Sequence, residues 1–173
     1  MLIKRIEKIA DSIILAIVTA ASSAMIAVVF AQVFCRYVLN DPLSWSEECA
    51  RYCFVYIAFC GGAWAGKEYA HLGVDYLVSK LPARAQDAVE LLIDAAVGLF
   101  SVLIVAVALI TIPKLSGQLS PAMRIPMYYP YSAIPIGFAF LAFYYALHFV
   151  EHLRKIRYGS DALTAEEREA IGC

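Results

Sequence analysis

The sequence is poor in charge. Only 17% of its 173 residues are charged, whereas soluble domains average about 25%. The formal net charge at pH 7 is −1, so no basic excess indicates a nucleic-acid partner. Apolar residues are abundant instead: 62% are hydrophobic, and the mean hydropathy is +0.70. This composition predicts an all-α integral membrane protein with one membrane domain, residues 1–173.

The sequence also lacks a convincing redox or metal centre. Its five cysteines form no Cys-x-x-Cys pair, and the stripe of Cys49, Cys53 and Cys60 is more typical of packing than of metal binding. Residues 148–152 match an inverted zinc-protease signature but have no obvious third ligand. We therefore predict no cofactor, no metal and no catalytic residue. A four-helix membrane redox protein, similar to a disulfide or quinone oxidoreductase, is the alternative function.

Four apolar runs predict four transmembrane helices, at about 13–35, 49–66, 88–112 and 129–149. The first run is too long for a signal peptide and is interpreted as an uncleaved helix. The runs lack a charge in the middle of a span, a broken half-helix pair and an internal repeat, which are the marks of a transport pathway. The chain alone is therefore a better scaffold than a translocator.

Shorter segments are predicted outside the spans. Residues 43–50 are expected to form an interfacial helix, in which Ser44 and Glu47 make a capping box. Residues 73–81 form a second interfacial helix, because their apolar side chains recur with helical spacing. A charged tail, 154–173, ends the chain.

The distribution of basic residues predicts the orientation. With four spans, both chain ends and the loop between the second and third spans share one side, which holds ten of the fourteen basic residues. Because basic residues accumulate on the cytoplasmic side, both termini are predicted to be cytoplasmic in a multi-pass protein of the bacterial inner membrane.

A group of charged residues surrounds the turn between the first two spans. Arg36 ends the first span, and Glu47, Glu48 and Arg51 begin the second, beside Trp45, which suits a membrane interface. We expect this cluster to fix the angle between the two spans, and a charge exchange between Arg36 and Glu48 would test whether those two residues pair; the alternative is an ordinary solvated helix start.

Two more features of the spans are candidates for helix contacts. Gly62 and Gly66 belong to a ladder of small residues, which lets helices approach closely. Glu90 and Asp94 lie one turn apart near one end of the third span. We expect these carboxylates to form structural pairs rather than to carry ions.

Two linked motifs carry a family resemblance. The sequence RYVLNDPLSWSEECARY, an apolar helix and then AHLGVDYLVSKLP resemble the small permease (Q-type, DctQ-like) subunit of tripartite ATP-independent periplasmic (TRAP) transporters. The likeness is strongest over about residues 36–85. The structural or interface candidates are Arg36, Ser44, Trp45, Glu47, Glu48, Arg51, Gly62, Gly66, His71, Asp75, Glu90 and Asp94.

The resemblance implies a function that the composition does not. It implies a secondary transporter that uses an ion gradient, usually sodium, to take up an organic acid such as sialic acid or a C4-dicarboxylate. The implied partners are a large permease subunit, a periplasmic solute-binding protein that docks transiently, and membrane lipids. In this interpretation the chain is a separate polypeptide that acts as a scaffold for the large subunit.

Overall fold

The computed structural model describes residues 2–69 and 83–158, and these residues form an all-α structure. The prediction of an all-α membrane protein is confirmed. The elements in chain order are α1 (Leu2–Phe34), η1 (Cys35–Leu39), α2 (Ser46–Tyr69), α4 (Ala83–Thr111), η2 (Ile112–Gly117), α5 (Tyr128–Tyr131) and α6 (Ala133–Tyr158).

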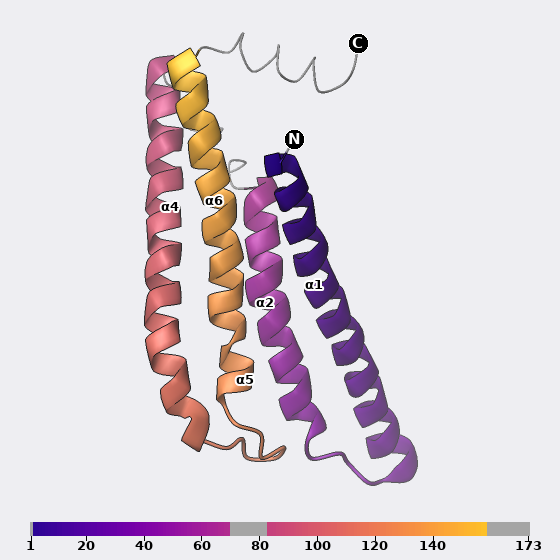
Figure 1. The fold of residues 1–173 in the computed structure, drawn as a ribbon. Helices are drawn as coiled ribbons and strands as arrows, with labels where there is room; N and C mark the ends of the chain where they lie inside the picture. The colour runs from indigo at the N-terminus through magenta and orange to yellow at the C-terminus, as the bar shows by residue number, and fades with distance from the viewer. Residues whose placement is uncertain (1, 70–82, 159–173) are drawn as a thin grey trace.

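The four long helices lie side by side in a row in the order α4, α6, α2, α1 (Figure 1). Helix α6 packs between α4 and α2, and α2 packs between α6 and α1. We call the end of the row where α1 begins and α6 ends the terminal end, and the end with η1 and η2 the loop end. Because the row leaves its broad faces open, large apolar side chains such as Phe30 and Leu92 are exposed, as suits a protein surrounded by lipid.

Three helical segments are long and apolar enough to cross a membrane, judged by length and composition within the described residues. They are Arg5–Leu39, Ala88–Gly117 and Tyr128–Val150. Helix α2 has 24 residues but is not among them. The fourth span, at 49–66, therefore stays a prediction.

The first two helices differ from the prediction at the turn that joins them. Helix α1 begins at Leu2 and continues into η1, so the first helix extends in both directions beyond residues 13–35. Asn40 then ends it with a left-handed φ of 55°, a conformation that asparagine tolerates better than most residues.

The start of α2 corrects the prediction of a separate helix at 43–50. Helix α2 begins at Ser46 and runs without interruption to Tyr69, so the residues from 46 to 50 are its first turn. Ser44 is too early to cap this helix. Ser46 is buried instead, and its hydroxyl donates to the Leu43 carbonyl at 2.6 Å, which holds the turn before the helix.

Close packing of α2 on α6 depends on a glycine that the sequence interpretation did not select. A Cβ atom on Gly137 of α6 would lie 2.7 Å from the backbone oxygen of Phe59, so only glycine fits there. A Cβ atom on Gly66 would lie 2.9 Å from the Leu141 side chain, so this part of α2 packs closely against α6. Gly62 has open space around it, so the predicted ladder of small residues is only partly used within this chain.

The core lies where three helices meet. Ile14 of α1, Cys60 and Ala63 of α2, and Tyr144 of α6 are buried together. Helix α4 makes no contribution to this cluster and packs on α6 alone among the long helices.

Several predicted features fall outside the described residues. These are the interfacial helix at 73–81, the candidates His71 and Asp75, and most of the charged tail at 154–173. Helix α6 continues to Tyr158, so the first residues of that tail extend the last helix.

Candidate functional site

A lysine near the end of α2 joins three helices at the terminal end. The Nζ atom of Lys67 lies 2.7 Å from Oδ2 of Asp11 and 2.8 Å from Oε1 of Glu7, both on α1. The Tyr144 hydroxyl of α6 donates to the other oxygen of Asp11 at 2.8 Å, and Lys67 lies over the Tyr144 ring. This cluster therefore ties α1, α2 and α6 together.

The Lys67 side chain is only 16% exposed, yet the site favours its charged form. Burial by itself lowers the pKa of Lys67, but the hydrogen bonds to Asp11 and Glu7 outweigh it, so the pKa is raised above its ordinary value of 10.5. The mostly buried Lys67 ammonium thus connects α2 to two carboxylates of α1, and removing one of these partners would leave a charge without compensation.

A second polar cluster joins α4 to α6. Asp94 is buried, and its Oδ2 atom lies 2.8 Å from Nδ1 of His152. The other ring nitrogen of His152 lies 3.5 Å from Oε2 of Glu90. Both ring nitrogens of His152 therefore lie near carboxylate oxygens of α4. The two carboxylates of the third predicted span are thus engaged by a side chain from the neighbouring helix.

At the loop end, Glu48 holds the loop between η2 and α5. Its Oε2 atom accepts hydrogen bonds from the backbone N–H groups of Ala122 at 2.9 Å and Met123 at 2.8 Å, and the Tyr52 hydroxyl donates to Oε1. The bond from Tyr52 is the largest influence and lowers the pKa of Glu48 below its ordinary value of 4.5; the two backbone bonds act in the same direction. Glu48 is therefore an ionised anchor for the loop.

The same face of α2 carries a second tyrosine contact to the start of the last helices. The Tyr56 hydroxyl donates to the Tyr129 carbonyl at 2.9 Å and lies 2.7 Å from the Ser132 hydroxyl. Tyr52 and Tyr56 are one helical turn apart, so they present their hydroxyls to the same side. Together with Glu48 they join α2 to α5 and to the loop before it.

Arg36 lies close to Glu47 rather than to Glu48. Arg36 lies 3.4 Å from Oε1 of Glu47, and Gln32 donates to the same oxygen at 3.2 Å. Glu48 is unavailable because it faces the loop on the other side of α2. The side chains of Arg36 and Glu47 are 50% and 64% exposed, so this pair is solvated. The other candidates of this cluster, Ser44, Trp45 and Arg51, are exposed.

The sequence interpretation missed most of the buried contacts. In the sequence, Lys67 contributed only to the count of basic residues that predicts the membrane orientation. Glu7, Asp11 and Tyr144 were not among the candidate site residues. One signal was present: Glu7 and Asp11 are four residues apart, so they share a face of the first helix, and such a face needs a cation nearby. Their partner lies 56 residues from Asp11 in the chain, which no local pattern indicates.

Metal or redox chemistry would need clustered ligands or paired cysteines. The four cysteines in this part of the chain, Cys35, Cys49, Cys53 and Cys60, are free thiols. No group of three or more ligating side chains within the described ranges is arranged to hold a metal ion. The polar side chains described above serve instead to connect helices.

Comparison with known proteins gives a consistent family. Residues 25–155 match the family model of the DctQ component of tripartite ATP-independent periplasmic transporters. The chain is 36% identical over 97 residues to the sialic acid TRAP transporter small permease protein SiaQ of Vibrio cholerae. These residues make up 56% of each of the two proteins. It is 27% identical over 163 residues to the C4-dicarboxylate small permease protein DctQ of the same species, covering 80% of this chain and 70% of that one.

A longer relative contains a similar segment. The isethionate TRAP transporter permease protein DctMQ of Oleidesulfovibrio alaskensis is 30% identical over 135 residues, which are 71% of this chain but only 21% of that protein. The family match covers well over half of the present chain, and the apolar helices agree with it. This protein therefore belongs to the DctQ family of TRAP transporters, whose members include small permease proteins.

Proposed function

We propose that this chain is a fixed scaffold for the large permease subunit of a TRAP transporter that takes up an organic acid across the bacterial inner membrane. The relatives' names mention sialic acid, C4-dicarboxylates and isethionate, all of which are organic acids. In DctMQ the matched segment is part of a much longer permease chain, which supports a large permease as the partner. The solute-binding protein and the sodium gradient belong to the same proposal.

The observation that carries the scaffold role is the use of the buried charges. Lys67, Asp94 and Glu48 each bind groups on a neighbouring helix or loop. Groups that carry an ion across a membrane must instead face a pathway and exchange partners. Charges that are already paired between helices hold those helices in place.

The arrangement of the row supports the predicted topology. The start of α1 and the end of α6 lie at the same end of the row (Figure 1). An even number of crossings has this property, so α2 is proposed as the fourth span, shielded between α1 and α6. With the basic residues counted above, both termini are proposed to face the cytoplasm.

The scaffold proposal is tested by locking two helices together. A Cβ atom on Gly98 of α4 would lie 3.8 Å from Cβ of Tyr145 on α6, which matches the usual separation in a disulfide. The double variant Gly98→Cys and Tyr145→Cys should therefore form a covalent link between α4 and α6 on oxidation. The native cysteines are replaced by alanine in this background.

Transport of a candidate acid is then measured in proteoliposomes that contain the large permease, with the link oxidised and reduced. A fixed scaffold predicts the same transport rate in both states. Each single cysteine variant serves as the control for the effect of the substitution alone. A rate that falls on oxidation and recovers on reduction would show that α4 and α6 move during transport, which contradicts the scaffold role.

A further inference from the structure

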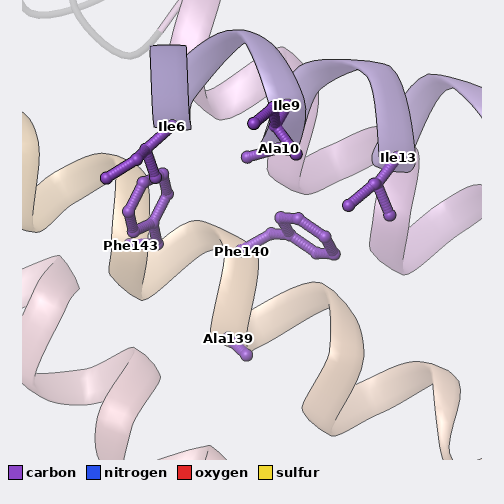
Figure 2. A pocket seen from close by; sticks show the side chains of 7 residues that line it. All are labelled: Ile6, Ile9, Ala10, Ile13, Ala139, Phe140 and Phe143. Carbon is purple, nitrogen blue, oxygen red and sulfur yellow. The ribbon is translucent and has the colours of Figure 1, made fainter. Parts of the chain in front are cut away.

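An apolar groove of about 340 Å³ lies between α1 and α6 near the terminal end. Figure 2 shows Ile6, Ile9 and Ile13 of α1 on one side of it and Phe140 and Phe143 of α6 on the other. Its volume is at the lower end of the range for small-molecule sites, about 300–1,000 Å³. The groove is a separate feature from the polar links between the helices.

The side chains along the groove remain uncovered in this chain. Ile6, Ile9 and Ile13 are 46%, 60% and 48% exposed. Hydrocarbon side chains form no hydrogen bonds with water, so an apolar occupant of the groove is favoured over water. From Ile6 to Ile13 the helix rises about 10 Å, which is the length of part of an acyl chain.

A basic residue lies next to the first groove-lining residue of α1. Arg5 immediately precedes Ile6 on α1 and is exposed, and the ion pairs found among the described residues do not include it. The adjacent acidic residues, Glu7 and Asp11, are paired with Lys67. A phosphate near Arg5 would therefore meet an unpaired guanidinium, which is the basic group best suited to bind it.

The geometry points to a phospholipid site: one acyl chain of an anionic phospholipid lies in the groove between α1 and α6, and its phosphate binds Arg5. The occupant matches the groove in two independent ways, because its tail is as apolar as the lining and its head carries the charge opposite to Arg5. The site requires only that the chain lies in a bilayer, so it does not rest on the transport proposal.

The test is native mass spectrometry of the purified full-length chain with phosphatidylglycerol or phosphatidylcholine. We expect one retained lipid, with phosphatidylglycerol preferred. Arg5→Gln should weaken retention of phosphatidylglycerol roughly fivefold, which corresponds to about 1 kcal/mol for one basic residue near an anionic surface. Lys8→Gln is the matched control: at 3.6 residues per turn, position 8 is about 150° from the middle of the groove-lining stripe, against about 90° for position 5.

A second pair of variants separates the groove from the charge. Ala139→Phe fills the groove and should abolish retention of either lipid, whereas Ala106→Phe places the same ring on an exposed position of α4 and should have no effect. Equal retention by all four variants and the native chain would overturn the site. So would loss of the bound lipid when the large permease is co-purified, because the groove would then be covered by that partner.

Discussion

At the terminal end of the row, side chains from helices far apart in the sequence pair with each other, whereas at the loop end the main anchor is a carboxylate bound to loop backbone. The first kind includes Lys67, whose side chain is mostly buried, and Asp94, which is fully buried; Glu48 is the member of the second kind. The loop end also has the pair of Arg36 and Glu47, which is exposed. The two ends therefore depend on charge in different ways.

The difference shows why the more conspicuous cluster is not the stronger one. Arg36, Glu47 and Glu48 are close in sequence and are therefore easily recognised as a cluster. However, water solvates both side chains of the Arg36–Glu47 pair and weakens the attraction between them. Lys67 and Asp94 are removed from water, and losing one partner there leaves an uncompensated charge. Variants at each end should separate these two cases.

The largest effect is expected at Lys67. Lys67→Met removes the cation and leaves Glu7 and Asp11 facing each other, so the free energy of unfolding should fall by about 3 kcal/mol. Unfolding of the detergent-purified protein with sodium dodecyl sulfate measures it. Lys114→Met, at an exposed lysine of η2, is the control and should change little. If both variants lost the same free energy of unfolding, the proposed difference between the two ends would be wrong.

The link between α4 and α6 should be the next most sensitive. Asp94→Asn removes the charge that His152 binds, and we expect a loss of about 2 kcal/mol, as for a hydrogen bond to a charged group. His152→Gln should cost a similar amount, and the double variant should cost less than the sum of the two. Additive losses would mean that the two side chains act independently. In the proposed complex with a large permease, Asp94→Asn should reduce complex yield without changing any sodium dependence that transport by the native complex has.

The loop end should respond to pH through Glu48. Its folded pKa is lowered, so its stabilisation is complete above the unfolded value and is lost as the pH falls through the lower folded value. Hydrogen exchange at the Ala122 and Met123 amides, corrected for the intrinsic rate, should therefore accelerate at acidic pH. Glu48→Gln should remove this pH dependence, while Glu47→Gln should keep it. An unchanged profile in Glu48→Gln would assign the effect to another group.

The smallest effect is expected for the exposed pair. Arg36→Gln should change the free energy of unfolding by about 0–1 kcal/mol, and added salt should reduce that difference further. The same denaturant titration measures it, with Glu47→Gln as the matching change on the other partner. A loss as large as that of Lys67→Met would show that this cluster organises the first two helices, as the sequence interpretation expected.

The sequence predicted the helices better than their contacts. The turn at Asn40 follows from a residue type that tolerates a left-handed conformation, and the apolar runs follow from composition along the chain. The sequence placed a capping residue at Ser44, but Ser44 and Ser46 both precede acidic residues, and the local pattern does not distinguish their roles. Only the structure shows that Ser46 is the buried one.

The contacts between helices could not be predicted because they join distant segments. Glu48 binds N–H groups 74 and 75 residues away, and a backbone donor leaves no mark in the sequence. The required glycine on the α2–α6 contact is Gly137 rather than Gly62, because the rotation of each helix decides which small residue faces a neighbour. Arg36 likewise met Glu47 rather than Glu48, although the two glutamates are adjacent.

By itself, the sequence determined that this is a helical membrane protein and which residues resemble the small permease family. Those properties depend on hydrophobicity and on motifs, both of which are local along the chain. The tertiary structure alone decided that the helices form a row and that Lys67, Asp94 and Glu48 connect its members. The reason is that a charge in an apolar setting is stable only where a partner comes within reach, and the packing of the helices sets which partners do.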